Sequence, residues 1–315
     1  MGYHPFISVI VPTHNMKWEL HKTLFSLSRQ IGIESREFEI LIMNTNPNDI
    51  DSLRMIENAS LEMGNIRLIN IHDSKTHTIT NATYPLNVGV RQYAKGPVLL
   101  LSVDSARVPT PGVVRKTRDE FDRWGDDIVT TTIPYHFLKH YSDPTITREE
   151  VRDAFLNSRW NHDLYSMFHH AAHTNISRSG KPNESTWLGV TRKNFLEVGG
   201  HNEIFTTWSD YNLDLWRRLT RSPPKNGIQI PKQDCHWGKV GLGLEVHILE
   251  GEGDFHLHHS LSDAQRSFKR LKELRIESWD EYEEIGNCIT ANLTRPDWGT
   301  SDRAEEVNLQ KTRYY

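Results

Sequence analysis

The chain has 315 residues, of which 25% are charged and 37% hydrophobic, and its formal net charge is -4. This composition predicts a globular protein, and the negative charge argues against a dedicated nucleic-acid binder. No basic run opens the chain, no apolar stretch approaches the length of a membrane span, and only Cys235 and Cys288 are present. We therefore expect a soluble, cytoplasmic protein with reduced thiols.

Strands and helices alternate in the first 70 residues. Apolar runs at residues 6–11, 38–43 and 66–69 predict three strands. Helical spacing between them predicts one helix that Asn15 can cap and a second at residues 52–62. The order strand, helix, strand, helix, strand predicts a mostly parallel, doubly wound sheet flanked by helices.

A fourth strand is predicted at residues 98–103, where an unbroken apolar run ends at Asp104. An apolar run without alternation indicates a strand that is buried on both faces, as in a parallel sheet. In open α/β sheets, ligands bind beyond the carboxyl ends of the strands. Asp104 and the adjacent Ser105 are therefore predicted to lie where a ligand binds.

Residues 87–109 resemble the nucleotide-sugar half of family 2 glycosyltransferases, which have the GT-A fold, a Rossmann-like α/β architecture. That family shows Asn-x-Gly, Ala-x-Gly, a hydrophobic strand, Asp-x-Asp and a proline in this order. The best register places Asp104 at the first aspartate, Ala106 at the second and Pro109 at the proline. A register shifted by two residues places Ser102 first and Asp104 second. One carboxylate of the pair is absent in either register.

The resemblance extends to the ends of the first two strands and implies a donor site there. The family's opening loop, here residues 12–15, touches the nucleotide base. Asn44 stands where the family has an aspartate, and its carbonyl could replace the carboxylate that accepts from a uracil N–H. Asn87 matches the family asparagine that supports the donor loop. The donor-binding residues predicted in this way are Pro12, Thr13, Asn15, Asn44, Asn87, Asp104 and Ser105.

An acceptor half is implied by residues 187–203, which resemble the family segment R-x-x-F-x-x-v-G-G-F-D-E, and by the Trp-x-Asp pattern that follows. Trp187, Gly200 and Trp208 are predicted on the acceptor side, although the Gly199-Gly200 pair could equally form a tight turn. Asp210 is the predicted catalytic base. Asp214 is the alternative, because alignment by D-L-x-x-R matches Asp214 to the end of the motif.

A divalent metal, Mn²⁺ or Mg²⁺, is the cofactor that the resemblance implies. Many GT-A enzymes use a C-terminal histidine opposite the Asp-x-Asp, and either His258 or His256 could take that role with Asp104. Carboxylate oxygens and one imidazole suit these ions. Because the second aspartate is absent, the alternatives are weak metal binding or no metal.

The predicted organisation is a GT-A domain over residues 1–260, with a donor half at 1–129 and an acceptor half at 130–260 that carries an irregular insertion. Residues 261–315 are predicted as a helical extension packed on the body. Contact with a membrane is expected only through this extension, as an alternative to that packing.

The expected function is an inverting glycosyltransferase of polysaccharide biosynthesis, a hexosyl- or N-acetylhexosaminyl-transferase. It would move a sugar from a nucleotide sugar, expected to be a UDP-sugar, to a saccharide or glycan-precursor acceptor. The lost family carboxylates leave open an alternative, a catalytically inactive protein that binds nucleotide sugars. A nucleotidyltransferase is disfavoured because residues 12–15 contain no phosphate-binding glycine.

Overall fold

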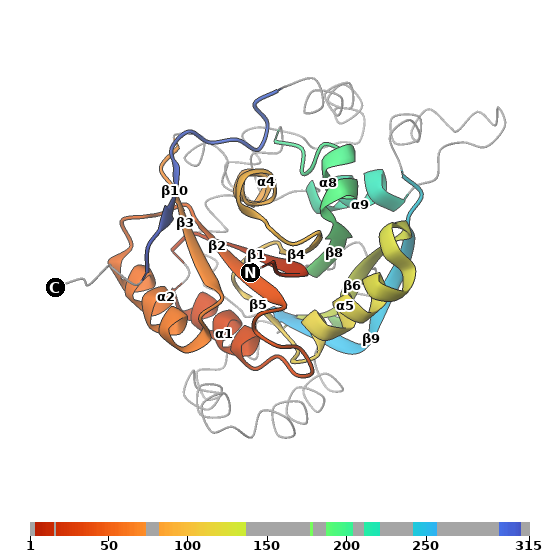
Figure 1. Ribbon diagram of the computed structural model, residues 1–315, viewed down its shortest axis with the longest axis horizontal. Helices are drawn as coiled ribbons and strands as arrows, with labels where there is room; N and C mark the ends of the chain where they lie inside the picture. The colour runs from red at the N-terminus through yellow and green to blue at the C-terminus, as the bar shows by residue number, and fades with distance from the viewer. Residues whose placement is uncertain are drawn as a thin grey trace.

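The computed structural model describes residues 4–15, 17–73, 82–136, 177–178, 187–203, 211–220, 242–256 and 296–309. These residues form one mixed β-sheet with helices on both faces (Figure 1). The strand order is β10-β3-β2-β1-β4-β8-β6-β9-β5, and β7 pairs with β6 outside this path.

The parallel part of the sheet comprises β1 (Ile7–Thr13), β2 (Phe38–Asn44), β3 (Ile66–Ile71) and β4 (Val98–Ser102). Nearly every residue of these strands is buried, because helices cover both faces. On one face α1 (Lys17–Ser28) and α2 (Ile50–Met63) pack against residues such as Val9 and Ile40. On the other face α4 (Thr83–Val88) and the π-helix η1 (Gly89–Tyr93) pack against Ile10 and Leu41.

The remaining strands continue the sheet beyond β4 and cover its other edge. They are β5 (Arg107–Pro109), β6 (Ile128–His136), β7 (Ser177–Arg178), β8 (Trp187–Thr191), β9 (Glu245–His256) and β10 (Ala304–Val307). The pairing directions make β1, β2, β3, β4, β6 and β9 run one way, so the mostly parallel sheet is confirmed. The other helices are α5 (Val113–Trp124), the 3-10 turn η2 (Gly125–Asp127), α8 (Arg192–Glu197) and α9 (Tyr211–Thr220).

Local sequence signals explain why the elements start and stop where they do. Asp49 caps α2, since its side chain accepts a hydrogen bond from the Ser52 backbone N–H at 3.2 Å. The same helix ends at Gly64, which has a φ of 64° and so takes the left-handed conformation that glycine tolerates. These caps direct the chain back into β3 alongside β2.

The end of the chain differs from the prediction. Residues 304–307 do not extend a helix but form β10, which pairs antiparallel with β3 at the edge of the sheet (Figure 1). The segment before it docks on α4 and η1, where the Arg91 guanidinium lies over the Trp298 ring, 4.6 Å from its centroid. The rest of the predicted extension, residues 257–295 and 310–315, lies outside the described residues.

Among the described residues, none of the helices has the length and apolar character that crossing a membrane requires.

Candidate functional site

The carboxyl ends of β1, β2, β3 and β4 lie along one edge of the sheet, because these strands are parallel and adjacent. Polar side chains gather where the strands end. Thr13 ends β1, Asn44 ends β2, Asn70 lies near the end of β3, and Asp104 follows β4. The structure therefore brings together the residues that the sequence predicts at the ends of β1, β2 and β4, and it adds Asn70.

The β1–β3 part of this edge carries four asparagines, Asn15, Asn44, Asn46 and Asn70, which we call the amide cluster. The buried Asn44 donates from Nδ2 to Asn70 Oδ1 at 2.9 Å, and its Oδ1 accepts from the Asn46 backbone N–H at 3.0 Å. Asn46 Nδ2 donates to Asn15 Oδ1. Asn15 has a φ of 55°, a conformation that asparagine adopts more readily than most residues. These bonds hold the cluster without any formal charge.

The strand-end loops are tied together beside the amide cluster. The Thr45 backbone N–H donates to Thr13 O at 3.1 Å, and Thr45 Oγ1 lies 2.9 Å from His14 Nδ1. Pro12 is buried within β1, opposite Met43 of β2. The buried Thr13 hydroxyl has no hydrogen-bond partner among the described residues. A buried hydroxyl without a partner is costly, so this one has the capacity to bond a ligand.

Asp104 is buried at the end of β4, with 6% of its surface exposed. Its Oδ1 accepts from the Ala106 backbone N–H at 2.8 Å, so the carboxylate holds the turn that follows the strand. Ser102 Oγ donates to the Asp104 carbonyl at 2.6 Å. Thr23 of α1 donates to the Ser105 carbonyl at 2.8 Å, which fixes this turn against the helix. The buried Ser105 hydroxyl has no hydrogen-bond partner among the described residues.

An arginine that the sequence reasoning missed joins Asp104 to a second carboxylate. Arg107 Nε lies 3.7 Å from Asp104 Oδ2, and Arg107 Nη1 lies 3.3 Å from Asp254 Oδ1. Asp254 is fully buried on β9 and also accepts from Thr132 Oγ1 at 2.5 Å. We call Asp104, Arg107, Asp254 and Thr132 the carboxylate–arginine cluster. Its formal charge is one negative unit, from two carboxylates and one guanidinium.

Asn87 holds the turn that follows α8. It is fully buried, its Nδ2 donates to the His201 carbonyl at 2.7 Å and to Glu203 Oε1 at 3.1 Å, and its Oδ1 accepts from the His201 backbone N–H. Glu203 Oε1 also accepts from the Gly299 backbone N–H at 2.6 Å. These contacts give Asn87 a positioning role between two chain segments. The donor-loop role predicted for it stays a prediction.

The acceptor residues predicted from the sequence are differently placed. Trp187 is fully buried on β8, opposite Ser102 of β4, so its indole offers no open face. Gly200 has a φ of 63°, and an added Cβ would lie 2.5 Å from the Trp298 ring, which explains the glycine by a tight turn and close packing. Acceptor contact by Trp187 or Gly200 stays a prediction that this packing does not favour.

Several predicted residues fall beyond what the structure describes. Trp208 and Asp210 lie in residues 204–210, and His258 lies in residues 257–295. Asp214 belongs to α9 and His256 to β9, but only their backbones are described. The His256 backbone pairs with Arg107 of β5, beside the carboxylate–arginine cluster.

A family model described as glycosyl transferase family 2 matches residues 8–181, which is more than half of the 315-residue chain. The chain belongs to this family. The matched residues include β1, β2, β3 and β4, the whole amide cluster, and Asp104, Arg107 and Thr132 of the carboxylate–arginine cluster. The match ends before α9 and β9, and so before Asp254.

Solved structures of S. aureus TarS are similar to this glycosyltransferase. The structure of TarS 1-349 in complex with UDP has 15% sequence identity and a TM-score of 0.49, and the comparison covers 94% of this chain and 72% of that one. Another TarS structure has 16% identity and a TM-score of 0.46, with 94% and 44% covered. No curated protein matches the chain.

The family often uses a divalent metal, and the described residues do not fit one. No group of three or more His, Cys, Asp or Glu side chains that could hold a metal occurs among them. The second position of the Asp-x-Asp is the buried Ala106, which has no ligand atom in its side chain. Asp104 Oδ1 accepts from a backbone N–H, and Oδ2 faces a guanidinium whose positive charge opposes a cation there. Ligation by His256 or His258 stays a prediction.

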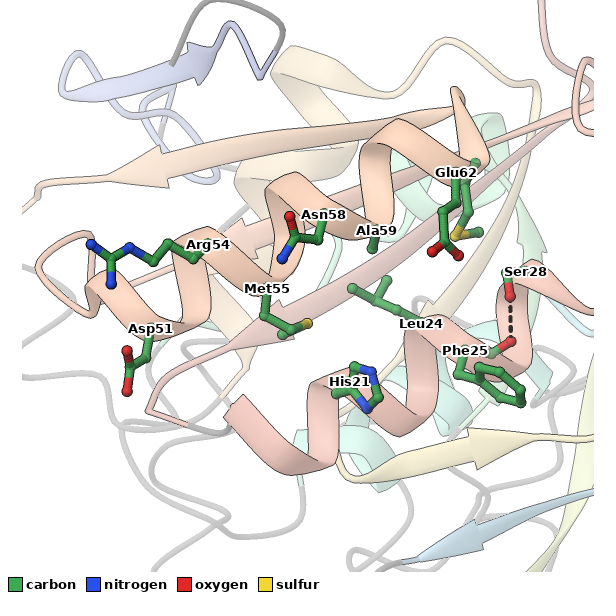
Figure 2. Close-up of a pocket in the computed structure, with 11 residues that line it drawn as sticks. His21, Leu24, Phe25, Ser28, Asp51, Arg54, Met55, Asn58, Ala59 and Glu62 are labelled. Carbon is green, nitrogen blue, oxygen red and sulfur yellow. Dashed lines mark hydrogen bonds between the residues drawn. The ribbon is translucent and has the colours of Figure 1, made fainter. Parts of the chain in front are cut away.

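A hollow between α1 and α2 lies on the helical layer of the glycosyltransferase (Figure 2). Apolar groups such as Leu24 and Met55 share its lining with polar ones such as His21 and Arg54. None of the residues predicted to bind donor or acceptor lines this hollow. We therefore do not assign it to sugar transfer.

Proposed function

We propose that this glycosyltransferase moves a sugar from a nucleotide-sugar donor, expected to be a UDP-sugar, to a saccharide or glycan-precursor acceptor with inversion. The observation that carries the proposal is Asp104 at the end of the central strand β4, on the same edge as the amide cluster. Open α/β sheets bind ligands at this edge, where strand order changes direction between β1 and its two neighbours.

The amide cluster suits a neutral nucleotide base. A uracil ring presents carbonyl acceptors and one N–H donor, and an asparagine amide offers both a donor and an acceptor. Asn44 and Asn15 use some of this capacity within the cluster, and the Thr13 hydroxyl adds a buried group with none of its own used. The proposal therefore places the base over β1 and β2 and the ribose beside Asp104.

The reaction needs one carboxylate to act as a base. The carboxylate takes the proton of the acceptor hydroxyl as that oxygen bonds to the anomeric carbon, and the bond to the nucleoside diphosphate breaks. The diphosphate leaves with the electron pair from the opposite side, which inverts the anomeric centre. We assign the base to Asp210, which directly precedes α9, with Asp214 as the alternative.

The turn at residues 199–203 supports this assignment by its position in the chain. It is held by Asn87, Glu203 and Gly299, and it leads directly into residues 204–210. This is the acceptor side of the proposal.

A second candidate, a protein that binds nucleotide sugars without transferring them, is favoured by one observation. The carboxylate that the family has at position 106 is a buried alanine methyl group here, and Asp104 is engaged with Arg107. Such a protein would bind the nucleotide at the strand ends and turn nothing over.

Substitution of the base separates the two candidates. We expect Asp210→Asn to lower transfer by about 10²–10⁴-fold, the usual contribution of a general base, while nucleotide affinity stays within about twofold. Asp119→Asn on the exposed surface of α5 is the matched control, and it should leave both quantities unchanged. Loss of transfer in Asp214→Asn with full activity in Asp210→Asn would move the base to Asp214. Nucleotide binding with no transfer by the unaltered protein, across UDP-, GDP-, CMP- and dTDP-sugars, would establish the second candidate.

A further inference from the structure

The geometry points to a donor site that works without a divalent cation, in which Arg107 positions Asp104 for the nucleotide instead of leaving it to ligate a metal. This inference rests on the proposed function, since it concerns how the same site binds its donor. It departs from the metal that the family resemblance implies.

The two carboxylate oxygens of Asp104 have different neighbours. Oδ1 accepts from the Ala106 backbone N–H at 2.8 Å, and Oδ2 faces Arg107 Nε at 3.7 Å. A cation bound to Oδ2 would lie close to the guanidinium and be repelled by it. To ligate a metal, Asp104 would have to turn away from Arg107, and a buried charge would lose part of its compensation.

Arg107 is held in place by both its side chain and its backbone. Its guanidinium bonds Asp254, its backbone in β5 pairs with His256 of β9, and its carbonyl accepts from Thr23 of α1 at 3.2 Å. Only 6% of the residue is exposed. The strand pairing and the bond from Thr23 fix the Arg107 backbone, and burial and Asp254 hold its guanidinium. The guanidinium is therefore a fixed positive charge beside Asp104.

Two buried polar groups beside Asp104 have unused hydrogen-bonding capacity among the described residues. The buried Arg107 Nε makes no hydrogen bond among the described residues, and neither does the buried Ser105 hydroxyl next to Asp104. Buried donors without partners are uncommon in native proteins and call for an explanation. Hydroxyl and phosphate oxygens of a nucleotide are acceptors for both groups, whereas a metal ion cannot be bound by the Arg107 N–H.

The donor contact that follows is made by neutral and charged hydrogen bonds alone. Asp104, kept in one orientation by Arg107, accepts from a hydroxyl of the donor, while Arg107 and Ser105 donate to its oxygens. Arg107 acts through Asp104 and is a positioning residue. Ala106 fits this site, because a carboxylate at that position would add a second buried negative charge that a cation would have to compensate.

Nucleotide binding with and without metal tests the inference. The probes are UDP, GDP, CMP and dTDP, titrated by calorimetry into the unaltered 315-residue chain in EDTA and again in millimolar MnCl₂. We expect one nucleotide to bind with affinities that agree within about twofold in the two buffers. Binding that is tenfold or more tighter in MnCl₂ would overturn the inference and leave the proposed function standing. Binding of no nucleotide in either buffer would overturn both.

A direct metal measurement removes dependence on the nucleotide. Free Mn²⁺ has an electron paramagnetic resonance signal that disappears when the ion is bound. With equimolar protein and Mn²⁺ at about 100 μM and no nucleotide, we expect the signal to stay. With nucleotide added, we expect the signal to match that of the same nucleotide and Mn²⁺ without protein. Loss of half the signal or more in the first mixture, or relative to the protein-free reference in the second, would contradict the inference.

Two arginine variants test the positioning role. Arg107→Lys keeps the charge but loses the planar fork, and Arg107→Met removes the charge; Arg115→Met on α5 is the surface control. In EDTA we expect nucleotide affinity to fall about tenfold or more in Arg107→Met and less in Arg107→Lys, with no change in Arg115→Met. Equal affinity in Arg107→Lys, Arg107→Met and the unaltered chain would overturn the role. If Arg107→Met does not fold, the comparison of Arg107→Lys with Arg115→Met decides: a loss of affinity supports the role, and no loss overturns it.

Discussion

The two halves of the strand-end edge solve the problem of buried polarity in different ways. The amide cluster over β1–β3 satisfies its groups with neutral hydrogen bonds, whereas the carboxylate–arginine cluster over β4, β5 and β9 buries three charges that compensate one another. Neutral amides cost little to bury when paired, but an ion that loses its partner costs several kcal/mol. The amide cluster should therefore lose less stability than the carboxylate–arginine cluster when one member is removed.

Removal of one charge should therefore have the largest effect. Asp254→Ala leaves Arg107 without its hydrogen-bonded carboxylate and Thr132 without its acceptor. We expect unfolding to become easier by about 3–5 kcal/mol, as for other broken buried pairs. Urea denaturation measures this change. The control is Asp119→Ala, which removes an exposed partner of Arg115 and should cost less than about 1 kcal/mol. Similar losses in the two variants would show that the buried charges of the carboxylate–arginine cluster do not depend on one another.

Removal of an amide should cost less. Asn70→Ala takes away the acceptor of Asn44 Nδ2, which is buried at the end of β2. An unsatisfied neutral donor costs about 1–3 kcal/mol, so the loss should lie below that of Asp254→Ala. The same urea experiment at low and high salt distinguishes the loss of a neutral hydrogen bond from the loss of a charge. The cost of Asn70→Ala should not depend on salt, and a dependence as strong as that of Asp254→Ala would show that the amide cluster is not the neutral half.

A smaller effect is expected at Thr13, where binding and stability should separate. Thr13→Val removes a buried hydroxyl that has no partner among the described residues, so the free protein should lose no stability and could gain up to about 1 kcal/mol. Nucleotide affinity should fall about three- to tenfold, the value of one neutral hydrogen bond. Calorimetric titration checks the affinity and urea unfolding checks the stability. Unchanged affinity would mean that this hydroxyl does not reach the nucleotide.

The smallest expected effect is electrostatic and lies outside both clusters. Hydrogen bonding to Arg67 holds the pKa of Glu306 below its usual value of 4.5, and partial burial opposes this shift. A carboxyl whose folded pKa is lowered stabilises the fold above its unfolded pKa, and the benefit is lost as the pH falls through the folded value. Because the Glu306 side chain is 43% exposed, solvent screening limits the contribution to less than about 1 kcal/mol.

Glu306→Gln tests this as a difference between two pH profiles. Its stability should fall below that of the unaltered chain at pH 7, and the difference should shrink as the pH falls below 4.5 and through the lowered pKa of Glu306. A constant difference from pH 7 to pH 3 would contradict the assignment. The loss of stability in Asn70→Ala should stay the same from pH 7 to pH 3, because neither the Asn44 nor the Asn70 amide titrates.

The parallel strands could be predicted from the sequence because each is a local apolar run between polar stops. Residues 38–43 and 98–103, for example, were enough to place β2 and β4 within one residue at each end. Asp104 and Asn44 could be placed on the ligand edge for the same reason, since a parallel strand directs the residue that follows it to that edge.

The partners of those residues could not be predicted, because they come from distant parts of the chain. Arg107 meets Asp254 across 147 positions, and Asn87 meets His201 across 114. No local pattern marks Asp254, which sits in a strand with mixed polar and apolar residues. Trp187 was placed on the acceptor side by its motif position alone, and its complete burial could not be read from that motif; acceptor contact by Trp187 stays a prediction.

The pairing of β10 with β3 has a consequence for how the protein is made. β3 is an apolar strand that leaves the ribosome early, and its outer edge is covered only when residues 304–307 have been synthesised. Until then its backbone N–H and C=O groups are a template for pairing with another chain. Contacts of such long sequence separation also form slowly. The nascent glycosyltransferase therefore exposes this edge from the synthesis of β3 until the synthesis of β10, and faster translation of the residues between them should shorten the exposure to aggregation.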